Sequence, residues 1–167
     1  FIPVKRGDFF KVPAGTVHAI GKGVTLCEVQ QSSGITYRVW DWGRVDANGV
    51  GRELHVEKAS GVLDFSEKFN DRLMLEMKRG LLDQVGISTL IEHESFNVQL
   101  FSQVLQEDMV LNLSEKDSLI VLDGELSFSN FKLNAFEAAI MPEAEEVEFK
   151  ASSQACFILV SEGKNEL

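Results

Sequence analysis

The sequence is poor in the features that mark membrane, secreted and disulfide-rich proteins. No apolar run approaches the roughly 20 residues that a membrane helix needs. The first residues also do not show the basic segment followed by an apolar segment that is typical of a signal peptide. The chain has 2 cysteines among 167 residues. Cys27 and Cys156 lie far apart in strand-like apolar stretches, so we expect two buried free thiols. Together these features predict a cytoplasmic protein with no membrane partner.

Positive charge is scarce after residue 60. Residues 1–60 hold eight Lys or Arg and six Asp or Glu, a balance of +2, whereas residues 61–167 hold eight and twenty, a balance of −12. An acidic surface repels nucleic acid, so we expect no nucleic-acid partner, although a local basic cluster can still attract a small anion. The hydrophobic content of 44% is ordinary for a globular chain with one or two β domains.

The most informative stretch is residues 7–22, which indicates a strand, a tight turn and a returning strand. Pro13 restricts φ and lacks a backbone donor, and Gly15 can take the positive φ that a sharp reversal needs. Apolar neighbours on both sides favour extended structure. The returning strand delivers one imidazole, that of His18.

A hairpin is the simplest interpretation of residues 23–42. Two strand-like runs, 23–31 and 35–42, flank a Ser-Ser-Gly turn. With Gly34 in the left-handed position of a three-residue loop, Glu28 falls opposite Arg38 on one face. The alternative is an exposed cross-strand ion pair of little energetic value.

The other two histidines carry less information. We expect His55 to be a packed or hydrogen-bonded structural residue and His93, between two glutamates, to be a surface residue. Residues 66–82 mix helix formers with apolar positions, which predicts a short helix. Beyond residue 88, short apolar stretches recur between turns, as is typical of antiparallel β structure. These stretches are 88–91, 96–105, 117–122, 125–128, 135–141 and 156–160.

Residues 136–147 form a weak internal echo of residues 7–18. A strand, a glycine turn at Gly124 and a second strand precede the echo, which strengthens it. The histidine is not repeated, so we expect the second unit to keep the fold while lacking metal chemistry. The alignment places Phe136 on Gly7, Pro142 on Pro13, Ala144 on Gly15 and Val147 on His18.

Two sets of motifs resemble a known family. The spacing of Gly7, Pro13, Gly15 and His18 is similar to the second conserved motif of the cupin superfamily, with Lys22 in place of its final Asn. Four blocks in order closely resemble the C-terminal half of bacterial type I mannose-6-phosphate isomerases, and they cover about the first 60 residues. These blocks are 12–20, 28–33, 36–42 and 52–59.

The resemblance implies a mainly all-β protein built from cupin-like jelly-roll units. We expect the first unit, residues 1–62, to be the incomplete C-terminal part of a metal-binding barrel. The second, residues 63–167, is expected to be a smaller, degenerate unit, with a short helix between the two. The chain opens on Phe1 almost directly into strand-like sequence, so we expect it to be a C-terminal fragment whose natural start is missing.

The resemblance also implies an activity and a site. It indicates a zinc enzyme, with one Zn²⁺ per full-length subunit, that interconverts mannose 6-phosphate and fructose 6-phosphate. The family's ligands are a Gln, a His, a Glu and a second His, and His18 matches the second His, whereas the other three belong to an upstream motif. Arg38 and Glu28 match residues implied in catalysis or in binding the anionic substrate. Gly34 stands where many relatives have Asp, a change that alters the hydrogen bonds of that loop.

Two functions from different classes therefore stay open. The first is the isomerase, with a sugar phosphate as its small-molecule partner; the second is a cupin module that binds a sugar or sugar phosphate without converting it. Because no His-x-His occurs, the chain shows no self-sufficient metal site. We expect it to be inactive alone and to bind zinc weakly at most. The sequence sets no oligomeric state.

Overall fold

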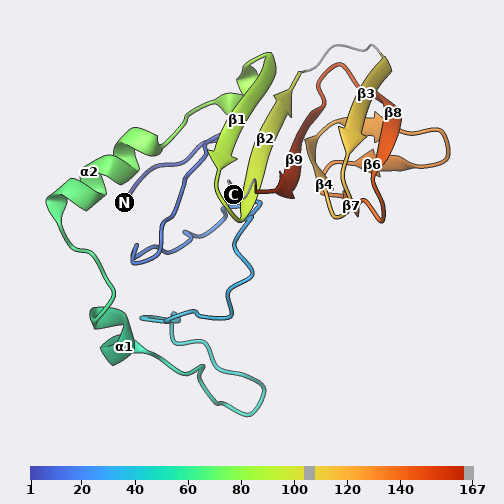
Figure 1. Ribbon diagram of the computed structural model, residues 1–167. Coiled ribbons are helices and arrows are strands. Elements are labelled where there is room, and N and C mark those ends of the chain that lie inside the picture. Colours follow the sequence, from blue (N-terminus) through green and yellow to red (C-terminus); the bar gives the residue numbers. More distant parts are fainter. Residues whose placement is uncertain (104–107, 164–167) are drawn as a thin grey trace. The chain divides into compact units, whose positions relative to one another are not determined.

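The computed structural model describes residues 1–103 and 108–163, and it divides the chain into two compact units (Figure 1). The β unit comprises Phe1–Phe9 and Met77–Leu167, and the loop unit comprises Phe10–Glu76. The domain boundary predicted after residue 62 stays a prediction.

The β unit consists of two antiparallel sheets. The order of the first is β1-β2-β9-β4-β7 and that of the second is β3-β8-β5-β6. A single turn of 3₁₀ helix, Leu81–Asp83, precedes the first strand. The strands are β1 (Gly86–Glu92), β2 (Phe96–Ser102), β3 (Asp108–Leu113), β4 (Ser118–Asp123), β5 (Glu125–Ser127), β6 (Lys132–Asn134), β7 (Ala138–Ile140), β8 (Glu145–Ala151) and β9 (Cys156–Glu162).

The pairing of these strands is that of a jelly roll. β2 pairs with β9, β3 with β8, β4 with β7 and β5 with β6, as in one long hairpin. Further pairs, β4 with β9 and β5 with β8, roll that hairpin into two facing sheets. The prediction of mainly antiparallel β structure is confirmed, and for this part of the chain so is the jelly-roll topology.

Aromatic side chains fill the space between the two sheets. Phe157 is fully buried and stacks on Phe101, with ring centroids 4.6 Å apart, while Phe149 meets it edge-on at 5.7 Å. Both geometries are favourable for aromatic pairs. Val147, the residue aligned with His18, packs against this apolar core. The position that bears an imidazole in the first repeat is therefore occupied by a packing residue in the second.

The echo between the two repeats extends to the backbone. Gly7 has φ +83°, and Phe136, which the alignment places on Gly7, has φ +71°. A left-handed conformation is uncommon for a residue as bulky as phenylalanine. That Phe136 shares this conformation with Gly7 therefore supports the alignment. Gly15 also has positive φ, at +83°, whereas Ala144 is not among the residues with positive φ.

The sequence analysis missed β3 and β8. In β8, Val147, Phe149 and Ala151 point inward while the residues between them are exposed. This alternation with period two is a strand signal, but the exposed face carries so much charge that no apolar run results. The other strands fall within the predicted stretches or next to them. Residues 104 and 105, the end of the stretch predicted over 96–105, lie outside the described residues.

The loop unit has two helices and no strand among its residues, all of which the structure describes. The helices are α1 (Val56–Ser60) and α2 (Glu67–Glu76), and α2 confirms the helix predicted within 66–82. The hairpin expected over 23–42 is not formed, because an isolated pair of strands is only marginally stable and gains no third strand here. Among the described residues, no helix is long and apolar enough to cross a membrane.

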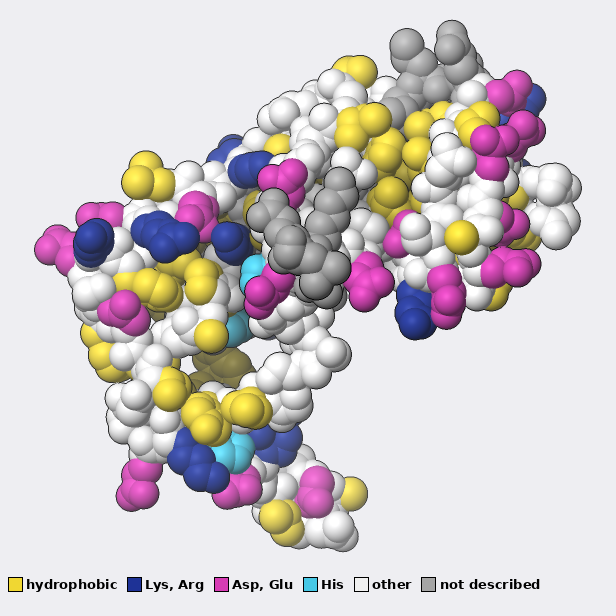
Figure 2. Space-filling model, in the orientation of Figure 1, with side chains coloured by type: hydrophobic (Ala, Val, Ile, Leu, Met, Phe, Trp, Pro, Cys, Tyr) yellow, Lys and Arg dark blue, Asp and Glu magenta, His cyan; other side chains and the backbone are white. Residues whose placement is uncertain are grey.

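Many apolar side chains of the loop unit consequently stay at the surface. The expected strands contribute Val24, Leu26, Ile35, Tyr37 and Val39, all of them exposed. Hydrophobic side chains are visible at many points of the molecular surface (Figure 2). Cys27 is exposed as well, so its predicted burial is wrong, whereas Cys156 is buried and both thiols are free, as predicted.

Candidate functional site

The turn that precedes His18 forms as the sequence predicted, but the two strands expected on either side of it within residues 7–22 do not form. The backbone N–H and the hydroxyl of Thr16 both donate to the carbonyl oxygen of Pro13, at 3.2 and 2.7 Å. Gly15 has the positive φ that this tight turn requires, and its carbonyl oxygen accepts a hydrogen bond from Asp64 N–H at 3.3 Å. The turn is thus held on both sides, and His18 follows it directly.

The environment of His18 suits a metal ligand. Nδ1 lies 3.0 Å from the carbonyl oxygen of Thr16. A carbonyl can only accept, so Nδ1 carries the proton and Nε2 keeps its lone pair. Histidines that bind metals usually donate their other ring N–H to a carbonyl or carboxylate in this way. The side chain is exposed, which leaves it accessible.

The described residues offer one histidine of this kind and not a set of metal ligands. No group of three or more His, Cys, Asp or Glu residues capable of holding a metal occurs among residues 1–103 and 108–163. His18 fits a zinc site as a single donor. The role of His18 as a ligand stays a prediction.

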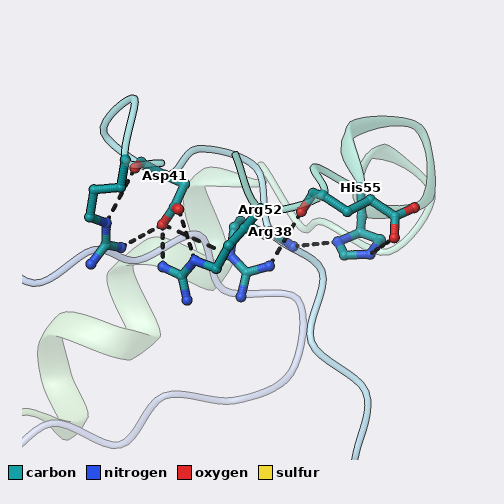
Figure 3. A network of polar contacts seen from close by, with 6 residues as sticks. Arg38, Asp41, Arg52 and His55 are labelled. Carbon is teal, nitrogen blue, oxygen red and sulfur yellow. Dashed lines mark hydrogen bonds and ion pairs between the residues drawn. The ribbon is translucent and has the colours of Figure 1, made fainter. Parts of the chain in front are cut away.

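Arg38 is held at both its backbone and its side chain. Its N–H donates to Nδ1 of His55 at 3.2 Å, and its carbonyl oxygen accepts from His55 N–H at 2.7 Å. Its Nη1 donates to the carbonyl oxygen of Glu53 at 3.3 Å, and its Nε lies 4.0 Å from the carboxylate of Asp41. Figure 3 shows this network.

Asp41 is the centre of a cluster of arginines. Its side chain is buried, and Arg52 binds both carboxylate oxygens, with Nε donating to Oδ2 at 2.8 Å and Nη2 donating to Oδ1 (Figure 3). Arg44 donates to Oδ1 and to the backbone carbonyl of Asp41. The hydrogen bond from Arg52, followed by that from Arg44, lowers the pKa of Asp41 from 3.8 to about 2.

The cluster carries an excess of positive charge beside an open hollow. Three guanidinium groups, those of Arg38, Arg44 and Arg52, surround the single carboxylate of Asp41. Asp41, Arg44 and Arg52 line a hollow of about 190 Å³. A guanidinium has five donors in a fixed plane, so a carboxylate does not saturate three of them. This arrangement can bind a small anion such as a phosphate ester.

The structure brings together only part of the predicted site. Glu28 is exposed, and in the part of the chain that the structure describes, its carboxylate forms no hydrogen bond or ion pair with Arg38. The expected cross-strand pairing is therefore wrong, because the strands that it needs are absent. Whether Glu28 and Arg38 act in catalysis is a separate matter and stays a prediction.

Sequence reasoning missed Asp41 and Arg52 and gave His55 only a structural role. Asp41 is the least exposed residue of its segment, but its sequence neighbours carry no motif that indicates a buried carboxylate. The available signal was position within the family-like blocks: Asp41 lies in block 36–42, and Arg52 and His55 lie together in block 52–59.

Parts of the chain are similar to proteins named mannose-6-phosphate isomerase. No model of a known protein family matches the chain. It is 55% identical over 69 residues to a mannose-6-phosphate isomerase of Streptococcus mutans, covering 41% of this chain and 22% of that protein. It is 56% identical over 63 residues to the mannose-6-phosphate isomerase ManA of Bacillus subtilis, covering 38% of this chain and 20% of that protein.

The chain is similar to mannose-6-phosphate isomerases. A putative mannose-6-phosphate isomerase of B. subtilis is 40% identical over 99 residues, which are 58% of this chain and 30% of that protein. The chain thus spans between 20% and 30% of the length of these curated relatives.

Similar solved structures were found as well. The mannose 6-phosphate isomerase of B. subtilis has a TM-score of 0.39 at 20% identity, over 75% of this chain and 40% of that one. A cupin-2 domain protein of Shewanella frigidimarina has a TM-score of 0.39 at 21% identity, over 56% of this chain and 91% of that one.

Proposed function

We propose that this chain is the C-terminal part of a zinc-dependent isomerase that interconverts mannose 6-phosphate and fructose 6-phosphate. The observation that carries the proposal is the identity of 55% over 69 residues to a protein named mannose-6-phosphate isomerase. The conformation of His18 and the excess of guanidinium groups around Asp41 support it. The substrate is an anionic sugar, which suits such a cluster.

In this proposal His18 holds the zinc through Nε2, and the Thr16 carbonyl orients the ring. Bound zinc supplies a Lewis acid that polarises sugar oxygens. The resemblance assigns the other ligands to an upstream motif, and the described residues contain no group of three or more His, Cys, Asp or Glu that could hold a metal. We therefore propose that the 167-residue chain alone neither isomerises the sugar nor binds zinc tightly.

The reaction moves one proton between neighbouring carbons. A base removes the proton at C2 of the open-chain aldose, the electrons pass to the C1 carbonyl oxygen, and an enediolate forms. Return of the proton at C1, with transfer of the O2 hydroxyl proton to O1, gives the ketose. Arg38 stabilises the negative charge of the enediolate or of the phosphate. Glu28 is the second residue to which we assign a catalytic role.

The test is zinc content and isomerase activity of the complete gene product that carries this chain. His18→Ala should lose stoichiometric zinc and activity, and Arg38→Ala should lose activity while retaining zinc. His93→Ala and Arg72→Ala are the matched controls, since both residues are exposed and neither is a member of the cluster, and both variants should behave like the parent.

If the unsubstituted complete gene product is folded but has neither zinc nor activity, the isomerase proposal is overturned. If such a parent bound mannose 6-phosphate, the alternative of a non-catalytic sugar-phosphate module would replace it. That the protein is cytoplasmic and has no nucleic-acid partner stays a prediction.

A further inference from the structure

His55 forms two hydrogen bonds with the backbone of Arg38, and we call this pair of hydrogen bonds the clasp. Its Nδ1 accepts the Arg38 N–H at 3.2 Å, and its own N–H donates to the Arg38 carbonyl at 2.7 Å. The two residues are 17 positions apart in the sequence. One residue therefore satisfies both backbone polar groups of Arg38, and no strand pairing is needed to hold it.

The place of His55 in the chain shows that its ring does not serve the adjacent helix. His55 is the N-cap residue of α1, yet its side chain makes no capping hydrogen bond. Histidine is not among the favoured N-cap residues, which are Ser, Thr, Asp and Asn. The ring instead turns to Arg38, and its Nε2 faces the Glu53 carboxylate at 3.7 Å (Figure 3).

The clasp acts together with two contacts on the Arg38 side chain. The Glu53 carbonyl and the Asp41 carboxylate hold its guanidinium, and the side chain is only 25% exposed. Arg38 is thus held at its backbone and at its guanidinium. Its side chain therefore loses little further conformational entropy when the guanidinium binds an anion.

We propose that His55 is a positioning residue for Arg38: it presents the guanidinium to the anionic substrate in one orientation. This inference rests on the function proposed above. Nδ1 must be an acceptor, so the useful tautomer carries its proton on Nε2, toward Glu53. Displacement of a substrate-contacting group by about 1 Å is enough to cost about 10²-fold in rate.

Two substitutions separate the acceptor from the bulk of the ring. In His55→Asn the carbonyl oxygen stands two bonds beyond Cβ, as Nδ1 does, and can accept the Arg38 N–H. In His55→Leu the side chain keeps apolar bulk but has no acceptor. We expect kcat/KM of the complete gene product to fall by about 10²-fold in His55→Leu and by less than about 5-fold in His55→Asn.

Zinc content and thermal stability should stay near those of the parent in both variants. His93→Leu is the matched control, because His93 also accepts a backbone hydrogen bond at an exposed turn, and it should leave kcat/KM unchanged. The inference is overturned if Asn is as damaging as Leu, or if Leu is harmless.

Hydrogen exchange of the Arg38 amide in the 167-residue chain tests the clasp without any activity. We expect exchange to be at least about tenfold faster in His55→Leu than in the parent, and near that of the parent in His55→Asn. Fast exchange in the unsubstituted chain would overturn the clasp itself. An inactive complete gene product with a protected Arg38 amide would instead overturn the proposed function.

Discussion

Gly15 and Val62 approach so closely that a Cβ on Gly15 would stand 2.7 Å from the carbonyl oxygen of Val62. The backbone at Gly15 also has φ +83°, a conformation that L residues rarely adopt. The turn before His18 therefore depends on the absence of a side chain at this one position, and both local and long-range geometry impose that requirement.

Gly15→Ala should displace the turn. The left-handed conformation costs an alanine roughly 1–2 kcal/mol, and the contact with Val62 forces a further shift of the backbone. We expect lower thermal stability and, in the complete gene product, weaker zinc binding, measured by competition with a chelator. Gly21→Ala is the control, because nothing lies within 4 Å of its Cβ position, and it should bind zinc as the parent does.

Asp41→Asn should abolish one component of acid sensitivity. The pKa of Asp41 is about 2 in the folded chain and 3.8 ordinarily, so its carboxylate stabilises the fold fully above pH 3.8. This contribution is lost as the pH falls through about 2. The asparagine variant should have a lower free energy of unfolding than the parent at pH 6. Its free energy of unfolding should fall less than that of the parent between pH 3.8 and about pH 2.

Trp40 and Trp42 flank Asp41 and are the 2 tryptophans of the chain, so their fluorescence during urea unfolding reports on the cluster. Asp71→Asn, at an exposed position of α2, serves as the control and should follow the parent at every pH. Identical pH dependence in Asp41→Asn and the parent would contradict the assignment.

Phe157→Ala should strongly destabilise the β unit. The ring is fully buried and contacts Phe101 and Phe149, so its removal costs about 3–5 kcal/mol in lost burial and a cavity. The free energy of unfolding, followed by circular dichroism in urea, measures this loss. Phe131→Ala removes a half-exposed ring from the same unit and should cost much less.

Phe136→Gly should stabilise the β unit. Phe136 has φ +71° and is 79% exposed, so glycine relieves the strained conformation and loses little buried surface. The expected gain is up to about 1 kcal/mol after the entropy cost of glycine. Phe136→Ala shortens the side chain but keeps Cβ, and hence it should bring no gain. Equal stability of the two variants would show that the strain is absent.

Much of the fold followed from local patterns. Alternating apolar stretches between turns predicted most of the β unit, because each strand covers the core with every second residue. The helix α2 and the positive φ of Gly15 were predicted correctly for the same reason: each depends on neighbours along the chain. β8 was missed because three charged residues on its exposed face hide an inward row of Val147, Phe149 and Ala151.

The sequence by itself determined the β character, the tight turn and the place of His18, since these need only propensity, periodicity and a glycine that tolerates positive φ. Only the tertiary structure decided what holds Arg38. Asp41 and His55 lie 3 and 17 positions from it, and it is they, not Glu28, that make the contacts. Hydrogen bonds and ion pairs act over a few ångströms, so the path of the chain through space chooses the partners.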